Sequence, residues 1–313
     1  MTTRAADTTH AIAAGIDIGG TKIEVQVFDS AWTTIARQRV ATPTNYPALL
    51  TAVTDVIGWA RDQSASPLPV GIGAAGLVNP ATGLALAANL PASGHPFPAD
   101  IAEHAGQPVT YINDCRALAV SEAVFGAGQP YRTVASIIMG TGIGGGICIE
   151  GHILTGPTAT GGELGHTAAP AHVVAAHNLP IVQCGCGRMG CIETLVAGPG
   201  LQRIAKHLTG ADLSPQEIAA RRHDDMAQVW DVWCALAAEL VLGLTLTVDP
   251  DVIVLAGGLS RITGIADDLA KAAAAAQFGG FGIPPIVLAQ GGDASGARGA
   301  AYVAWQDQHG ANA

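Results

Sequence analysis

Two runs with alternating apolar side chains flank the glycines of residues 12–28, IAAGIDIGGTKIEVQVF. This pattern predicts a β-hairpin that turns at Gly19-Gly20-Thr21. The pattern returns at residues 134–149, VASIIMGTGIGGGICI, where strand-like runs flank a glycine loop. The chain therefore divides into two halves that begin alike, which is a weak internal repeat.

Helix-like and strand-like segments alternate along both halves. In the first half, periodicity predicts a helix over residues 46–61, a buried strand over 70–73 and a helix over 116–125 that ends at Gly126. In the second half it predicts a long helix, a core strand followed by a glycine turn, and two alanine-rich helices, at residues 226–248, 252–256, 265–277 and 296–308. This alternation indicates the α/β class. We expect an N-terminal domain at 1–125 and a C-terminal domain at 126–295.

Composition restricts the partners of the chain. It has 313 residues, of which 49% are hydrophobic and 13% charged, and its net charge is −10. An acidic chain lacks the basic face that binds nucleic acids or anionic membranes, so we expect neither partner. The longest apolar run, residues 235–248, contains Glu239 and is shorter than the ~20 residues that span a bilayer. Asp7 and His10 interrupt the segment where a signal peptide is apolar, so we expect a cytoplasmic protein.

Three cysteines crowd into residues 183–193, QCGCGRMGCIE. A disulfide between Cys184 and Cys186 would close a very tight ring, and cytoplasmic chains seldom form one. Thiolates at this spacing, with glycines that let the backbone curl, suit a tetrahedral zinc ion; the alternative is three buried or redox-active thiols. The run lacks a fourth ligand, for which the upstream candidates are His166, His172 and His177.

The sequence GELGH at residues 162–166, followed by this cysteine run, resembles the signature of the ROK (repressor, open reading frame, kinase) sugar kinases. The resemblance extends over residues 16–305. It implies a two-domain, actin-like ATPase fold of the α/β class, with a cleft between the domains that closes over ATP and a sugar. The last helix, at 296–313, would pack back on the first domain, and the family suggests a homodimer.

The resemblance also completes the metal site. It makes His166 the fourth zinc ligand, and it leaves His172 and His177 without a role; the other ligands are Cys184, Cys186 and Cys191. With all four positions filled by protein, the zinc would be structural. It would clamp a loop that presents Glu163, His166 and Glu193 to the sugar.

Three glycine turns look like the nucleotide-binding loops of this fold. Their residues are Asp17, Gly19, Gly20, Thr21 and Lys22 in the first, Gly140, Thr141 and Gly142 in the second, and Gly257 and Gly258 in the third. Glycines let backbone N–H groups approach phosphate oxygens, the Thr21 hydroxyl adds a donor, and Asp17 at a strand end can hold magnesium through water. A glycine hairpin taken singly is also an ordinary turn.

The pair Asn113-Asp114 resembles the pair that supplies a sugar contact and the catalytic base in this family. Phosphorylation of a hydroxyl needs a base on that hydroxyl, and the resemblance gives this role to Asp114. Its place before a helix from Arg116 also predicts a simple helix cap.

Two residues depart from the family pattern. Arg116 brings a cation that would lower the pKa of Asp114 or contact phosphate, and Ala75 replaces a proline in a loop that borders the sugar.

Residues 88–94, ANLPASG, resemble a stretch of bacterial N-acetylglucosamine kinases. On this resemblance Ser93 and Gly94 lie near the acetamido group and Gly76 lines the ring. Residues 191–194 and 292–296 resemble fructokinases and mannokinases at least as much. We expect phosphorylation of the 6-hydroxyl of N-acetylglucosamine, with a hexose kinase as the alternative.

Two other classes of protein are disfavoured. A sugar-responsive repressor needs a DNA-binding module, but the segment before residue 12 is too short for a helix-turn-helix and the chain is acidic. A catalytically idle sugar-binding module would not need Asp114 and the phosphate loops, which are intact.

Overall fold

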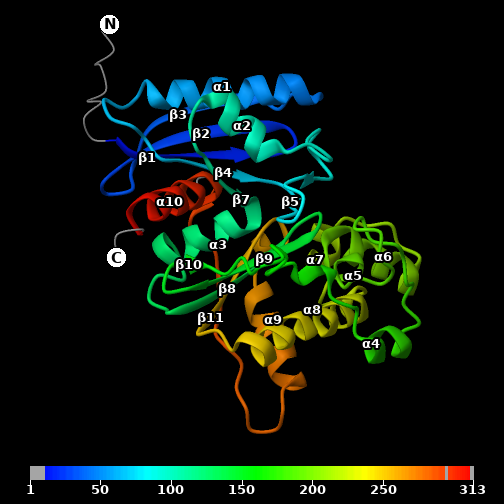
Figure 1. The fold of residues 1–313 in the computed structure, drawn as a ribbon. Coiled ribbons are helices and arrows are strands. Elements are labelled where there is room, and N and C mark those ends of the chain that lie inside the picture. Colours follow the sequence, from blue (N-terminus) through cyan, green and yellow to red (C-terminus); the bar gives the residue numbers. More distant parts are fainter. Residues whose placement is uncertain (1–10, 293–294, 311–313) are drawn as a thin grey trace, which may run out of the picture. The chain divides into compact units, whose positions relative to one another are not determined.

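The computed structural model describes residues 11–292 and 295–310, and the chain forms two compact units (Figure 1). Of the described residues, unit 1 contains those up to Gly126, Gly151–Gly161 and those from Gly291 onward. Unit 2 contains Ala127–Glu150 and Gly162–Gln290. Several residues used in the predictions lie outside the described ranges, namely Asp7, His10, Asp293, Ala294 and 311–313.

Unit 1 is built on a five-stranded sheet with the order β3-β2-β1-β4-β7. β1 (Ala11–Ile18) and β2 (Lys22–Asp29) pair antiparallel, which confirms the predicted hairpin. β3 (Thr34–Ala41) pairs antiparallel with β2. β4 (Val70–Ala74) lies parallel to β1, and β7 (Thr110–Asn113) lies parallel to β4.

Helices cover both faces of this sheet (Figure 1). α1 (Tyr46–Arg61) and α2 (Phe97–Ala105) lie on one face, while α3 (Asp114–Phe125) and α10 (Ser295–His309) lie on the other. Asn45 begins α1, because its side chain accepts a hydrogen bond from the backbone N–H of Ala48 at 3.0 Å. Two short strands, β5 (Leu77–Val78) and β6 (Ala85–Leu86), form a separate hairpin.

Glycines let α10 lie directly on the backbone of its neighbours. A Cβ atom on Gly15 of β1 would lie 1.8 Å from the carbonyl oxygen of Ala297. A Cβ atom on Gly299 of α10 would lie 1.7 Å from the carbonyl oxygen of Ala117 in α3. No larger residue fits at these positions without moving the helix, so the close packing of α10, α3 and the sheet depends on glycine.

Four strands of unit 2 repeat the arrangement of unit 1. Their order is β9-β8-β11-β12, where β8 (Thr133–Met139) and β9 (Ile143–Ile149) form the second predicted hairpin. β11 (Val252–Ala256) and β12 (Ile286–Leu288) follow in parallel. In both units a glycine hairpin is extended by parallel strands beside its first strand, so the internal repeat seen in the sequence is a repeat of topology.

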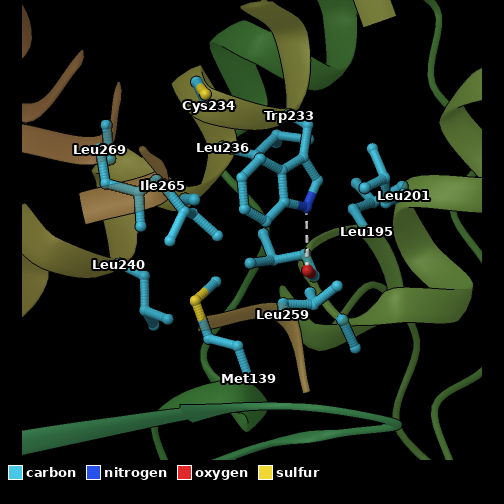
Figure 2. Packing of buried hydrophobic residues seen from close by; sticks show 14 of the residues in the cluster. Met139, Leu195, Leu201, Trp233, Cys234, Leu236, Leu240, Leu259, Ile265 and Leu269 are labelled. Atoms are coloured by element: carbon cyan, nitrogen blue, oxygen red, sulfur yellow. Dashed lines mark hydrogen bonds between the residues drawn. The ribbon is translucent and has the colours of Figure 1, made fainter. Parts of the chain in front are cut away.

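The core of unit 2 surrounds Trp233 of α8 (Ala227–Val248). Its indole Nε1–H donates to the carbonyl oxygen of Val196 at 2.9 Å, and leucines and Met139 surround the ring (Figure 2). Further helices of this unit include two long ones, α6 (Gly198–Thr209) and α9 (Ile265–Ala276). The short helical elements are α4 (Ala171–Ala176), α5 (Glu193–Val196), α7 (Pro215–Ala220) and the 3₁₀ turns η1 (Leu164–His166) and η2 (Leu259–Arg261).

Among the described residues, α8 is the one helix long and apolar enough to cross a membrane. In the structure 61% of its most apolar window is buried within the protein. Helices at the core of globular domains have the same length and composition.

Most predicted elements are confirmed with shifts of one or two residues at their ends. α1 and β11 have the predicted bounds. The largest difference that concerns the site is at α3, which begins at Asp114 rather than at Arg116.

Candidate active site and metal centre

Asn113, rather than Asp114, caps α3. The side-chain Oδ1 of Asn113 accepts hydrogen bonds from the backbone N–H groups of Cys115 and Arg116 at 2.9 and 3.2 Å. Asn113 is extended, with φ −64° and ψ 144°, and Asp114 is already helical. The cap predicted for Asp114 is therefore wrong, because the preceding asparagine fills that position. The Asp114 carboxylate accepts a hydrogen bond from Cys115 N–H at 2.8 Å.

Asp114 and Asp17 lie together in a partly buried, acidic environment. Burial raises the pKa of Asp114, although hydrogen bonds from Cys115 oppose this effect. Burial and the negative charge of Asp114 raise the pKa of Asp17 to about 6, and Lys22 opposes this rise. A cation among these carboxylates would relieve their repulsion, so the donor set at Asp17 fits a magnesium ion.

Glu24 belongs to this acidic group but was not among the predicted residues. The hairpin register pairs Asp17 with Glu24, which directs both side chains to one face of the sheet. Glu24 is 2% exposed, and its Oε2 accepts from Arg39 Nε at 2.7 Å and lies 3.9 Å from Lys22 Nζ. The signal was present in the sequence, because a hairpin that turns between Gly19 and Lys22 places residue 24 opposite residue 17.

The first glycine turn is closed by backbone hydrogen bonds. Gly19 N–H donates to the carbonyl oxygen of Lys22 at 2.9 Å, and the Thr42 hydroxyl donates to the carbonyl oxygen of Gly19 at 2.7 Å. A Cβ atom on Gly20 would lie 3.2 Å from the carbonyl oxygen of Asn89. The predicted phosphate turn therefore adjoins the segment predicted to contact the sugar.

Gly76 and Asn113, both predicted to contact the sugar, lie next to each other. The Asn113 side-chain N–H donates to the carbonyl oxygen of Gly76 at 3.0 Å, and Gly76 has a φ of +101°. The Ser93 hydroxyl accepts from Ala87 N–H at 2.8 Å and donates to Ala87 O at 2.7 Å. Since this hydroxyl closes its own loop, the backbone of Ser93 and Gly94 is the part of the segment that is suited to contact a sugar.

Arg116 does not act on Asp114 in the predicted direction. Its guanidinium donates to the carbonyl oxygen of Gly161 through Nε at 3.0 Å and to that of Ala159 through Nη2 at 2.7 Å. The pKa of Asp114 is raised, whereas a dominant effect of a neighbouring cation would lower it. Arg116 thus bonds the loop at 159–161, a contact that was not among the predictions.

The four predicted zinc ligands come together in unit 2. One ligand atom from each of His166, Cys184, Cys186 and Cys191 lies within 4.8 Å of the others. Cys186 Sγ lies 3.6 Å from Cys191 Sγ, and Cys184 Sγ lies 3.5 Å from His166 Nδ1. Sulfur ligands ~2.3 Å from one tetrahedral ion are ~3.8 Å apart, so the residues fit zinc. His172 instead lies 3.5 Å from Glu239 of α8.

The predicted sugar contacts of unit 2 adjoin this cluster. His166 Nδ1 lies 3.7 Å from Glu193 Oε1, and His166 Nε2 lies 3.8 Å from Glu163 Oε2. One ring nitrogen therefore faces Cys184 and Glu193, while the other faces Glu163. This arrangement allows a single histidine to serve both the metal and a second ligand.

Glu193 also joins the cysteine cluster to the second glycine loop. Its Oε2 accepts a hydrogen bond from Ile143 N–H at 3.0 Å, and its Oε1 accepts from the Cys184 thiol at 2.9 Å. A Cβ atom on Gly142 would lie 2.9 Å from the Glu193 carboxylate. This link was not predicted from the sequence, because Ile143 and Glu193 are 50 residues apart and no local pattern connects them.

The third predicted nucleotide turn packs against Met139, the residue that precedes the second turn. Gly257 has a φ of +87°, and a Cβ atom there would lie 2.4 Å from the carbonyl oxygen of Met139. Gly198, the first residue of α6, donates its N–H to the carbonyl oxygen of Gly140 at 2.9 Å. Gly140 N–H donates to Gly142 O at 2.9 Å, which closes the loop around Thr141.

The predicted site residues therefore form one group in each unit. Unit 1 contains the turn at 17–22 together with Gly76, Ser93, Gly94, Asn113 and Asp114. Unit 2 contains the turns at 140–142 and 257–258, the cysteine cluster, Glu163 and Glu193.

Sequence relatives identify the family of the chain. The model of the ROK family matches residues 13–307. The N-acetylgalactosamine kinase AgaK of Shewanella sp. (strain ANA-3) is 40% identical over 294 residues, which cover 92% of this chain and 95% of the relative. The N-acetyl-D-glucosamine kinase of Haemophilus influenzae (strain 86-028NP) is 35% identical over 295 residues, which cover 92% of this chain and 97% of that kinase.

Solved structures agree on the fold. The ROK hexokinase from Thermus thermophilus superposes with a TM-score of 0.82 at 28% identity, over 94% of this chain and 99% of that one. A ROK family glucokinase from Streptomyces griseus, in complex with glucose and AMPPNP, gives a TM-score of 0.73 at 29% identity, with the same coverage of 94% and 99%. These matches confirm the expected α/β, actin-like fold of the sugar kinases. The chain belongs to the ROK family.

Proposed function

We propose that this chain is an ATP-dependent sugar kinase that phosphorylates the primary 6-hydroxyl of an N-acetylhexosamine, with N-acetylglucosamine as the first candidate. The main support is sequence identity over 92% of the chain with two named kinases. The identity is 40% with an N-acetylgalactosamine kinase and 35% with an N-acetyl-D-glucosamine kinase. The 40% match makes N-acetylgalactosamine the second candidate.

In this proposal Asp114 is the catalytic base. Burial raises its pKa, and a raised pKa makes its carboxylate a stronger base than that of an exposed aspartate. The carboxylate accepts the proton of the sugar hydroxyl, the hydroxyl oxygen forms the new bond to the γ-phosphorus of ATP, and ADP leaves. The cap of α3 is supplied by Asn113, so helix capping does not compete with this role.

Asp17 would hold the magnesium ion. The ion, when bound, neutralises phosphate charge during the transfer. The pKa of Asp17, raised to about 6 by burial and by Asp114, fits a carboxylate whose ionised form needs a nearby cation. The nucleotide phosphates would contact the backbone of Gly19, Gly20, Thr21, Gly140, Thr141, Gly142, Gly257 and Gly258, with Lys22 as a cation.

The sugar would be oriented by residues of both groups, which are Gly76, Ser93, Gly94, Asn113, Glu163, His166 and Glu193. A structural zinc on His166, Cys184, Cys186 and Cys191 would supply no chemistry to the reaction. It would fix the loop between Glu163 and Glu193, and its support is the 4.8 Å clustering of four ligand atoms. His166 contributes Nδ1 on the cysteine side, which leaves Nε2 for a sugar hydroxyl.

A sugar panel tests the proposal. Specificity constants would be measured by ADP release with Mg-ATP for N-acetylglucosamine, N-acetylgalactosamine, N-acetylmannosamine, glucose, mannose and fructose. We expect the acetamido sugars to be preferred, because a site that pairs an amide leaves polar groups unpaired when a plain hexose enters. A preference of about tenfold or more for a plain hexose, or about 1.4 kcal/mol, would instead establish the hexose kinase alternative.

We further propose a cytoplasmic homodimer that binds neither nucleic acid nor membrane. Every cysteine is free in the structure, which fits a reducing compartment that also supplies ATP. Light scattering on the purified protein would test the assembly, since a mass near that of one 31.5 kDa chain would contradict it.

A further inference from the structure

Arg116 is a buried cation that donates two hydrogen bonds to one backbone loop. It is 4% exposed and lies in the first turn of α3, two residues after Asp114. Burial of a guanidinium is costly unless its N–H groups are hydrogen-bonded. Two of these groups donate to the carbonyl oxygens of Ala159 and Gly161, which are 43 and 45 residues away along the chain. Proximity along the chain therefore does not explain this contact, which depends on the tertiary fold.

The loop that Arg116 holds is tightly folded. It ends the segment Gly151–Gly161 of unit 1, which begins with the short strand β10 (His152–Ile153). Ala159 has a φ of +55°, a conformation that costs energy for any residue with a Cβ atom. A Cβ atom on Gly161 would lie 3.2 Å from the carbonyl oxygen of Leu154, so the loop returns onto its own start. Such a conformation persists when outside contacts fix it, and Arg116 bonds the strained residue itself.

The two ends of this contact lead to proposed catalytic and sugar-binding residues. The backbone of Arg116 is bonded by the Asn113 cap, one residue before Asp114. Gly161 is followed along the chain by Gly162 and Glu163. The planar guanidinium of Arg116 donates from Nε and Nη2 to two carbonyl oxygens at once. A lysine ammonium lacks this planar arrangement of donors.

We propose that Arg116 is a positioning residue of the kinase, which ties the turn that carries Asp114 to the loop that leads into Glu163. This inference rests on the proposed function. In this role Arg116 takes no part in the bond changes; it limits the positions of the base and of the chain that leads to Glu163. Small displacements of such groups are costly, because phosphoryl transfer depends on the alignment of the hydroxyl and the base.

The neighbouring cavity makes a rescue experiment possible. Arg116 lines a cavity of ≈ 620 Å³ in unit 1, together with Asn113, His152, Thr155, Ala159 and Gln306. Truncation in Arg116→Ala would open space next to this cavity, through which a small cation can enter. Guanidinium, at concentrations far below those that unfold proteins, should therefore restore part of the activity of the variant. Methylammonium, which lacks the planar fork, should not.

The kinetic test compares Arg116→Ala and Arg116→Lys with Arg61→Ala. Arg61 is the matched control, because it also lies in unit 1 and its guanidinium also donates to two acceptors. These are the backbone carbonyl oxygen of Ala105 and the side-chain amide oxygen of Gln107. We expect Arg116→Ala to lose about tenfold or more in kcat/KM for the sugar, or about 1.4 kcal/mol, with the KM for ATP nearly unchanged. Arg116→Lys should be intermediate, and Arg61→Ala should keep the wild-type kinetics.

Hydrogen exchange supplies a readout that needs no turnover. Amides at 154–161 should exchange faster in Arg116→Ala than in the wild type, and guanidinium should restore their protection. Kinetics that stay at wild-type values in both Arg116 variants, or a rescue of protection without a rescue of kcat/KM, would overturn the positioning role. A wild-type protein that phosphorylates no sugar of the panel would overturn the proposed function, whatever the exchange data show.

Discussion

The two glycine hairpins share a topology and differ in the source of their charges. In unit 1, Asp17, Lys22 and Glu24 stand on the strands of the hairpin itself, and the register pairs Asp17 with Glu24. In unit 2 the strand β9, IGGGICI, contains no charged residue, and the backbone N–H of its first residue, Ile143, donates to the carboxylate of Glu193. The first hairpin therefore supplies charged side chains. The second supplies glycine backbone, against which other groups can pack closely.

Packing accounts for this difference. A Cβ atom on Gly145 of β9 would lie 2.5 Å from the carbonyl oxygen of Ser136 and 2.7 Å from Leu164 Cδ1. Side chains at this point would displace the turn η1, which carries His166. The same supersecondary unit is thus used for buried ionisable groups in one unit and for tight backbone packing beside a candidate metal centre in the other. Variants of each hairpin and its neighbours test this division.

The largest effect is expected from Asp114→Asn. Loss of the base should lower kcat by about 10²–10⁴-fold. Thermal stability should be equal or higher, because Asn113 caps the helix and a buried carboxylate with a raised pKa is unfavourable when ionised. Steady-state kinetics and thermal unfolding check both parts. Asn113→Ala is the control, and it should lose about 1 kcal/mol of stability with the cap. Normal turnover by Asp114→Asn would remove Asp114 from the mechanism.

The candidate metal centre of unit 2 should lose its metal only when its own cysteines are replaced. Protein purified without chelator should contain about one zinc per chain. The double variant Cys184→Ser/Cys186→Ser should lose the metal, since two of its four ligands are gone. Cys234→Ala, which alters a buried cysteine of α8 outside the cluster, should retain it. Elemental analysis decides the matter, and zinc that persists in the double variant would refute the site.

The Asp17 carboxyl on the first hairpin should make the free energy of unfolding depend on pH. Burial and the charge of Asp114 raise the pKa of Asp17 to about 6 in the folded state, above its ordinary value of 3.8. A folded-state pKa above the unfolded-state value favours the protonated native state, so the carboxyl costs stability as pH rises from 4 to 6. Asp17→Asn should therefore stabilise the magnesium-free protein by up to about 3 kcal/mol at pH 7 and by little at pH 4. Denaturant unfolding at the two pH values measures this, and an equal effect at both would contradict it.

Two neighbouring glycines of unit 2 give the smallest and most local contrast. Gly257→Ala places a Cβ atom 2.4 Å from the backbone of Met139 at a φ of +87°, whereas nothing lies within 4 Å of a Cβ atom on Gly258. Gly257→Ala should lose about 2 kcal/mol of stability or more and raise the KM for ATP. Gly258→Ala should have at most a small effect on stability. Urea unfolding of the pair checks this, and equal losses would show that the turn can adjust.

Residues close together in the sequence were predicted well. The two hairpins, the long helix α8 and the strand β11 follow from apolar periodicity and from glycine, which act over a few residues. The four ligand atoms of the cysteine cluster also came together as expected from the resemblance, within 4.8 Å. Asp114 was predicted to cap the helix, which is wrong, because the choice between two adjacent polar residues depends on where the backbone turns into the helix.

The sequence by itself determined the α/β class, the repeated glycine hairpins, the cysteine cluster and the family resemblance, because spacing and local propensity are properties of the chain. Only the tertiary structure decided that Arg116 bonds the loop at 159–161, that Glu193 bonds Ile143, and that Gly257 lies against Met139. These contacts join segments 43 or more residues apart, as in Arg116 with Ala159. A charged side chain finds its partner among all the groups that folding brings near, so its destination is a property of the packed fold rather than of its neighbours in sequence.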